Sequence, residues 1–295
     1  MSPAFSKFKT RYILIDIILS IIVMSIFIAM ISAITGLNGR EIGNNKILQF
    51  TSLIVVFGLS WSILKRLEKS GIHPQYLIGN TSLRDIPWII VLIIFGGIEI
   101  LQRGLNQLTL FCTNLVSPSF LNSELAQISQ NNLRFSYQND SLSLKILFYG
   151  FLFITTIIIS PLVGEFLFRG VFLHRFSHKW GITTGILVSS ALSGLLTHNI
   201  YSIAIGITAI FIALVYIKIP SLVVPIAYNA MHGTIWLISK LIEGIPCVQN
   251  PIDITPKSMW LGLLSISFAL LILYYFLKWP ENIEELPYNV NSQQN

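Results

Sequence analysis

The stretch Ile146-Leu-Phe-Tyr-Gly-Phe-Leu-Phe-Ile-Thr-Thr-Ile-Ile-Ile-Ser-Pro-Leu-Val163 contains no charged residue. A helix needs about 20 mostly apolar residues to cross the hydrocarbon core of a bilayer. The chain contains eight runs of this kind, at 12–35, 47–64, 86–101, 146–163, 182–197, 200–217, 222–242 and 259–277. The pattern predicts an all-α, polytopic integral membrane protein with about eight transmembrane helices.

The composition of the whole chain agrees with this fold class. Of its 295 residues, 53% are hydrophobic and only 11% are charged, and the mean hydropathy is +0.71. An ordinary soluble domain carries about 25% charged residues. The formal charge of +6 comes from Lys and Arg residues that lie mostly between the apolar runs and form no basic patch interleaved with aromatic residues. We therefore exclude a soluble enzyme and a nucleic-acid partner, and expect the lipid bilayer as the environment.

The basic residues between the runs also predict an orientation. Lys7, Lys9 and Arg11 precede the first run, which favours a cytoplasmic N-terminus. With that start, more of the Lys and Arg residues fall on the cytoplasmic side than outside. Both termini are then cytoplasmic, and we expect a multi-pass protein of the bacterial cytoplasmic membrane.

Two ionisable residues follow the quoted run directly, in the sequence Pro161-Leu-Val-Gly-Glu-Phe-Leu-Phe-Arg-Gly170. An ionisable group inside a membrane helix is unfavourable by roughly 2.5–3.5 kcal/mol on insertion scales, so a functional or pairing role is the default interpretation. Glu165 and Arg169 are four residues apart and share a helix face, so they can form an ion pair. Spacing alone leaves open whether this pair is structural or functional. Glu99 and Asp16 lie close to the ends of runs, where the interface is within reach.

Three further polar residues lie within or at the ends of later runs. His198 ends one run, and Asn229 and His232 share a helix face behind Pro225, which can kink the helix and open space beside it. A carboxylate, two imidazoles and an amide on separate helices could meet in one polar cavity. Such a set can hydrolyse a bond by activating water directly, or by holding a metal ion whose bound water is acidified. Glu165, His198 and His232 are the candidate ligands of such a metal, which would be a divalent ion such as zinc, and the sequence does not decide between a site with a metal and one without.

The order and flanks of these residues resemble the CPBP family of intramembrane proteases, which includes CAAX prenyl endopeptidases and bacteriocin-processing or immunity proteins. The first family motif, Glu-Glu-x-x-x-Arg, aligns its second glutamate with Glu165 and its arginine with Arg169. The second motif, Phe-x-x-x-His, ends at His198. The third motif, a His or Asn that follows a Ser-Leu-x-x-Pro stretch, aligns with Asn229 after Ser221-Leu-Val-Val-Pro225. The resemblance covers roughly residues 144–242.

Three positions depart from the family pattern. Gly164 stands where the first glutamate activates water in the family, Gly194 replaces the phenylalanine of the second motif, and Gly233 replaces the polar partner that follows Asn229. His232, one position before Gly233, can substitute for that partner. A carboxylate moved from position 164 to 165 turns by about 100° around the helix, which disfavours the geometry of the original base.

The resemblance implies an intramembrane endopeptidase that hydrolyses a peptide bond in a membrane-embedded or lipidated substrate. Its candidate catalytic residues are Glu165, Arg169, His198, Asn229 and His232. The departures leave two alternatives open. In one, the site is rebuilt with Glu165 or Glu99 as its carboxylate. In the other, the protein is an inactive pseudoprotease that acts as a membrane binding or bacteriocin-immunity protein. A small transporter is disfavoured because no inverted repeat is visible.

We expect three regions along the chain. Residues 1–143 form N-terminal transmembrane helices and an outer loop, residues 144–242 form the protease-like core, and residues 243–295 form a last transmembrane helix and a cytoplasmic tail.

Overall fold

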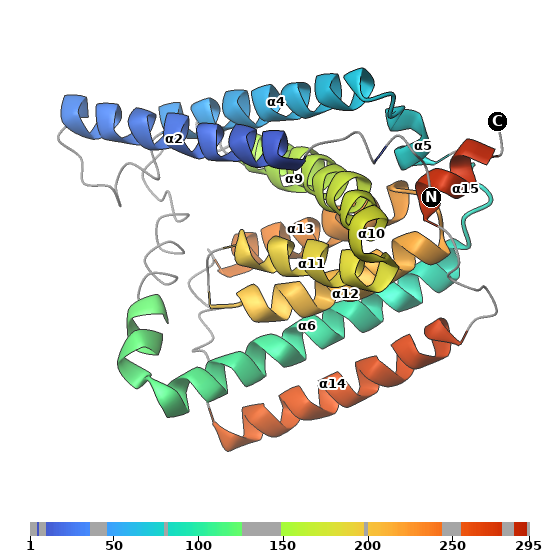
Figure 1. Cartoon of the computed structure of the whole chain (residues 1–295). Coiled ribbons are helices and arrows are strands. Elements are labelled where there is room, and N and C mark those ends of the chain that lie inside the picture. Colours follow the sequence, from blue (N-terminus) through green and yellow to red (C-terminus); the bar gives the residue numbers. More distant parts are fainter. Residues whose placement is uncertain are drawn as a thin grey trace. The chain divides into compact units, whose positions relative to one another are not determined.

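The computed structural model describes residues 5, 10–35, 46–79, 82–125, 149–197, 200–243, 255–278 and 286–293. Within these ranges every regular element is helical, and each of the eight apolar runs overlaps a helix (Figure 1). The all-α prediction is therefore confirmed. The chain forms two compact units, Ser2–Gln75 and Tyr76–Asn295, and each is described by itself.

The first unit contains the helix pair α2 (Thr10–Thr35) and α4 (Lys46–Lys69). An ion pair joins the two helices: Arg66 Nε and Nη2 donate to the two carboxylate oxygens of Asp16 at 2.7 and 2.8 Å. Ser62 Oγ donates to the same carboxylate at 2.8 Å. Asp16, near the start of its apolar run, is thus a paired acid that fixes one helix against the other.

The second unit holds most of the helices. The junction between the units carries the short α5 (Pro74–Ile78). Beyond it come α6 (Trp88–Val116), α9 (Ser160–Glu165), α10 (His174–Trp180), α11 (Ile182–Leu195), α12 (Ser202–Lys218), α13 (Val223–Glu243), α14 (Pro256–Leu277) and α15 (Pro287–Gln293). Gly181, with φ of 89°, makes the sharp reversal between α10 and α11.

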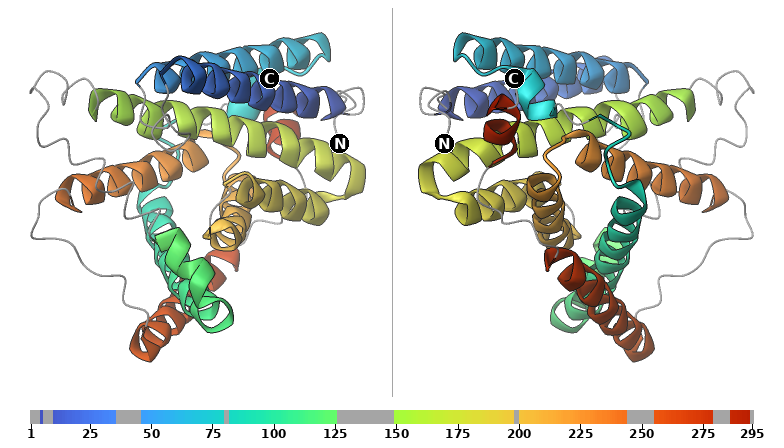
Figure 2. Two further views of the ribbon diagram at one scale, coloured as in Figure 1. Left: turned by 90° about the vertical axis from the view of Figure 1, so that its left-hand side faces the viewer. Right: turned by 90° about the vertical axis from the view of Figure 1, so that its right-hand side faces the viewer.

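Helices α6 and α14 lie side by side and antiparallel (Figure 1, Figure 2). Glycine lets their backbones approach: a Cβ added to Gly104 would lie 2.7 Å from the carbonyl oxygen of Gly262. At the other end of the contact, Gly97 packs against the side chain of Ile272. Small residues at such crossings are typical of helix pairs in membranes, where close packing drives association.

Three helical stretches are long and apolar enough to cross a membrane, namely Trp88–Val116, Tyr149–Trp180 and Pro256–Phe276. They coincide with the third, fourth and eighth predicted runs. Two other apolar helices, Ile182–Leu195 and Ser202–Lys218, are shorter. At 1.5 Å per residue a helix of 17 residues rises about 25 Å, less than the hydrocarbon thickness of about 30 Å. Three of the eight predicted spans thus meet the criteria of length and composition within the described residues.

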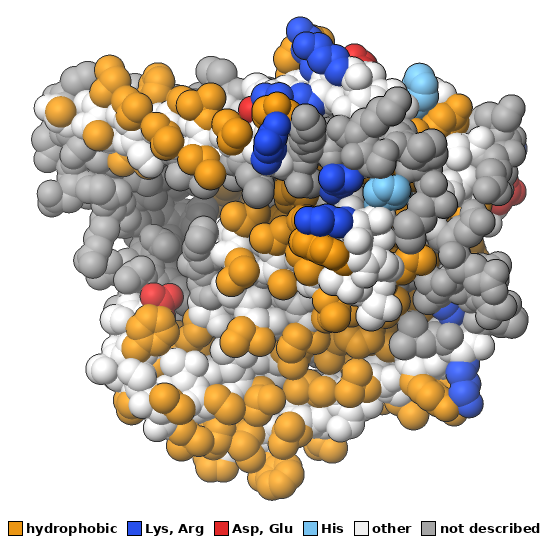
Figure 3. All heavy atoms as spheres, in the orientation of Figure 1, with side chains coloured by type: hydrophobic (Ala, Val, Ile, Leu, Met, Phe, Trp, Pro, Cys, Tyr) orange, Lys and Arg blue, Asp and Glu red, His pale blue; other side chains and the backbone are white. Residues whose placement is uncertain are grey.

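The outward faces of α6 and α14 are apolar. Many hydrophobic side chains appear over these two helices in the lower part of Figure 3. On α14 the exposed side chains include Trp260, Leu264, Phe268, Leu271 and Tyr275. An apolar surface of this kind is suited to contact with lipid chains rather than with water.

Candidate active site

The site is built on one long helix whose winding changes along its length. Helical structure runs from Tyr149 to Trp180, but the segments η1 (Ile154–Ile159) and η2 (Phe166–Leu173) are π-helical. Between them, the short α9 contains Pro161, which has no backbone N–H to give to the preceding turn. Wide π-helical turns are rare, and they recur at functional sites. They set the directions in which the side chains of α9 and η2 project.

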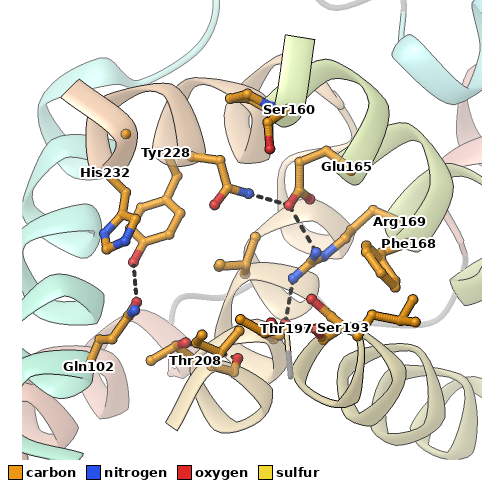
Figure 4. Close-up of a pocket in the computed structure, with 18 of the residues that line it drawn as sticks. Gln102, Ser160, Glu165, Phe168, Arg169, Ser193, Thr197, Thr208, Tyr228 and His232 are labelled. Atoms are coloured by element: carbon orange, nitrogen blue, oxygen red, sulfur yellow. Dashed lines mark hydrogen bonds and ion pairs between the residues drawn. The ribbon is translucent and has the colours of Figure 1, made fainter. Parts of the chain in front are cut away.

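A cavity of about 360 Å³ lies beside α9 (Figure 4). Its walls come from α6, η1, α9, η2, α11, α12 and α13, together with the turn that follows α11. Its polar lining consists of Gln102, Thr156, Ser160, Glu165, Arg169, Ser193, Thr197, Thr208, Tyr228, Asn229 and His232. Polar groups converging in a chamber between apolar helices are the arrangement expected of a site for chemistry or binding.

The ion pair predicted from the spacing of Glu165 and Arg169 is confirmed. Arg169 Nη1 donates to Glu165 Oε1 at 2.9 Å, and the two side chains are only 3% and 2% exposed. Arg169 Nη2 also donates to the carbonyl oxygen of Ala209 in α12 at 3.1 Å. The guanidinium therefore ties η2 to α12 while it neutralises the buried carboxylate.

Asn229 completes this cluster from α13. Its Nδ2 donates to the same Oε1 atom of Glu165 that Arg169 contacts (Figure 4). The bond fixes the orientation of the amide and leaves its second N–H for another acceptor. Glu165 Oε2, by contrast, is buried and has no hydrogen-bond partner among the described residues. Oε1 of Glu165 thus accepts from two donors, whereas Oε2 is buried without a partner among the described residues.

His232 belongs to a second polar cluster on the opposite wall. Its Nδ1 lies 2.9 Å from Glu99 Oε2, and its ring stacks on that of Tyr228 with an interplanar angle of 21°. Arg103 Nε approaches the other oxygen of Glu99 at 3.4 Å. Tyr228 donates to Gln102 Oε1 at 3.4 Å. Sequence reasoning placed Glu99 near the end of an apolar run, but its fixed partner, 133 positions away, becomes visible only in the tertiary structure.

His198, the remaining candidate catalytic residue, lies outside the described residues. Thr197, which precedes it in the chain, and Ser193 both line the cavity. The other four candidates, Glu165, Arg169, Asn229 and His232, line that cavity as well.

The three glycines that depart from the family motifs have different structural explanations. At Gly194, an added Cβ would lie 2.5 Å from the carbonyl oxygen of Ser202, so the crossing of α11 and α12 has no room for the family's phenylalanine. At Gly233, an added Cβ would lie 2.8 Å from the carbonyl oxygen of Thr156. At Gly164 nothing lies within 4 Å of an added Cβ. Two departures therefore serve close packing, whereas the third leaves open space in the cavity wall.

The described residues contain no group of three His, Cys, Asp or Glu side chains that could hold a metal ion. Glu165 fits a ligand role poorly, because a guanidinium already occupies one of its oxygens and would repel a second cation. His232 is committed to Glu99 through Nδ1. No step of the chemistry below is therefore assigned to a metal.

His174 is a structural partner of the site that sequence reasoning missed. It is 1% exposed, and its Nδ1 lies 2.9 Å from the carbonyl oxygen of Arg169. Its Nε2 accepts from the backbone N–H of Tyr288 in α15 at 3.2 Å. The ring therefore carries its proton on Nδ1 and donates it to Arg169. A histidine five positions after Arg169, directly behind the apolar stretch Val171-Phe-Leu173, was the signal available in the sequence.

One family model matches part of this chain. Residues 146–235 match the family model described as type II CAAX prenyl endopeptidase, Rce1-like. The match contains Glu165, Arg169, His198, Asn229 and His232, and it confirms the family resemblance derived from the motifs. No curated protein and no solved structure matches the chain. The apolar helices and the Rce1-like domain together make this an integral membrane protein.

Proposed function

We propose that this Rce1-like membrane protein is an intramembrane endopeptidase, which hydrolyses a peptide bond in a lipidated or membrane-embedded substrate. The observation that carries the proposal is the polar cavity of about 360 Å³, whose walls include four candidate catalytic residues of the matched segment. The family description, type II CAAX prenyl endopeptidase, favours prenylated substrates of the Cys-a-a-X type. A chamber between apolar helices suits a substrate that arrives from the bilayer.

Peptide hydrolysis needs an activated water, donors for the oxyanion and a supply of protons to the leaving amine. Asn229 is suited to the oxyanion role, because Glu165 fixes its amide and one N–H remains available at the cavity. The buried pair of Glu165 and Arg169 holds this amide in place and contributes a preorganised polar wall. We assign proton transfer to His198 and His232, the two imidazoles of the candidate set.

The predicted topology is part of the proposal. All eight apolar runs overlap helices, so we retain eight membrane segments with both termini cytoplasmic and a core at residues 144–242. Helices too short to cross alone, such as α11 and α12, would lie within the protein assembly and require tilt or local thinning of the bilayer.

A second candidate function is a pseudoprotease that binds a membrane peptide without cutting it. Gly164 favours this alternative, because the position that carries the water-activating glutamate in the family has no side chain here, although nothing lies within 4 Å of the place that a Cβ would occupy. A binding or immunity protein could retain the cavity and lose only this group.

The test is cleavage in detergent of three fluorogenic peptides: a prenylated peptide ending in Cys-a-a-X, the same peptide without the prenyl group, and a membrane-embedded leader peptide. We expect the wild type to cleave one of them and His198→Ala to cleave none. Cleavage by Gly164→Glu alone would identify the natural protein as a pseudoprotease. Full activity of His198→Ala would remove the proposed mechanism.

A further inference from the structure

We propose that His232, positioned by Glu99, is the general base of this site in place of the carboxylate that Gly164 lacks. The inference rests on the proposed endopeptidase function and adds a positioning residue, Glu99, that lies outside the matched segment of residues 146–235. It also gives Glu165 a structural role.

The geometry is that of an oriented imidazole. Glu99 Oε2 lies 2.9 Å from His232 Nδ1, at the hydrogen-bond distance for a carboxylate and a ring N–H. A carboxylate that accepts from Nδ1 fixes the tautomer in which Nε2 carries the free electron pair. Nε2 makes no hydrogen bond with any described residue. The His232 ring also stacks on the ring of Tyr228. Its orientation is therefore restrained by the Tyr228 ring on one face and by the Glu99 contact at Nδ1.

The positions of the two residues match these roles. The His232 side chain is 35% exposed and lines the cavity. The Glu99 side chain, on α6, is 12% exposed and contacts His232 without being part of the cavity lining. A general base must reach water, and the group that orients it need not. The neighbouring charge, Arg103, approaches Glu99 Oε1 and leaves the Oε2 contact to the histidine.

Glu165 is unsuited to be the base. Arg169 and Asn229 both donate to its Oε1, so this oxygen is already engaged by two hydrogen-bond donors. Its other oxygen is buried. Gly164 also lines the cavity, and nothing lies within 4 Å of a Cβ added there, which leaves space for water and a substrate carbonyl.

The chemistry balances without a further reactant. Nε2 of His232 takes one proton from a water molecule while the water oxygen adds to the peptide carbonyl carbon. Glu99 stabilises the imidazolium that forms. The tetrahedral intermediate then collapses, the C–N bond breaks, and the proton passes from the imidazolium to the leaving nitrogen by way of His198, the other imidazole to which proton transfer is assigned. The products are one carboxyl terminus and one amine.

The first test needs no enzymatic activity. Diethyl pyrocarbonate acylates unprotonated imidazole nitrogens, and mass spectrometry measures the rate at each histidine of the full-length protein at pH 8. The exposed His73 serves as the internal reference. We expect His232 to react readily in the wild type, several-fold more slowly in Glu99→Gln, and at the wild-type rate in the matched control Glu68→Gln, the same change at an exposed acid. An unreactive His232 beside a reactive His73 would overturn the inference whatever the activity.

The second test uses kinetics. Loss of a general base lowers kcat by about 10²–10⁴-fold, so we expect this for His232→Ala, with partial rescue by added imidazole. Loss of the orienting carboxylate in Glu99→Gln should lower kcat by up to about 10⁴-fold with little change in KM. A structural role would not produce rescue by imidazole, so rescue also separates lost chemistry from misfolding.

The outcomes separate the inference from the proposed function. If the wild type cleaves and His198→Ala does not, but His232→Ala retains activity within a few-fold, the endopeptidase stands and the His232 assignment is wrong. If neither the wild type nor Gly164→Glu cleaves any of the three peptides, the proposed function falls and the assignment falls with it.

Discussion

Replacement of Glu165 by glutamine tests whether the buried ion pair holds the core together. The change keeps the size of the side chain and removes its charge, so Arg169 is left as an uncompensated cation that is 3% exposed. At the 2.9 Å separation of the pair, Coulomb's law with an effective dielectric constant of 20 gives an attraction of about 6 kcal/mol. Breaking a buried pair by removing one partner destabilises proteins by about 3–5 kcal/mol. We expect a loss in that range.

The assay is thermal unfolding in detergent, followed by the fluorescence of the six tryptophans. At roughly 2–4 °C per kcal/mol, the midpoint should fall by about 6–20 °C. The control is Asp85→Asn, the same chemical change at an exposed acid, for which we expect less than about 0.5 kcal/mol. The double variant Glu165→Gln/Arg169→Met should recover part of the loss. Unchanged stability of Glu165→Gln would refute the argument that the pair stabilises the fold.

The remaining predictions concern the glycines, and the same unfolding assay measures them. Gly164→Ala should preserve or raise stability by up to about 1 kcal/mol, because alanine favours helix and nothing lies within 4 Å of the added Cβ. Gly233→Ala should lower the midpoint, because its Cβ would lie 2.8 Å from the carbonyl oxygen of Thr156; a stabilised variant would contradict that contact. Gly194→Phe, which restores the family residue, should destabilise the protein more than Gly194→Ala, since the α11–α12 crossing has no space for a ring.

The three glycines that depart from the family motifs differ in their structural surroundings. Gly164, Gly194 and Gly233 look alike as departures from a family pattern. In the structure, two of them are places where helix backbones meet and one faces an open cavity. From the sequence alone, a glycine that has replaced a catalytic side chain looks the same as a glycine that allows close helix packing. The difference depends on which atoms of a neighbouring helix lie beside the glycine.

The sequence by itself determined the helical fold class, the membrane environment and the Glu165–Arg169 pair. Each depends on local information: the length of apolar runs, the scarcity of charge and a spacing of four residues on one helix. The tertiary structure decided which polar groups meet. It joined Asn229 to Glu165 and His232 to Glu99, pairs separated by 64 and 133 positions. Contacts of this kind depend on how helices pack and wind, including the π-helical turns around α9, and no local pattern of residues encodes them.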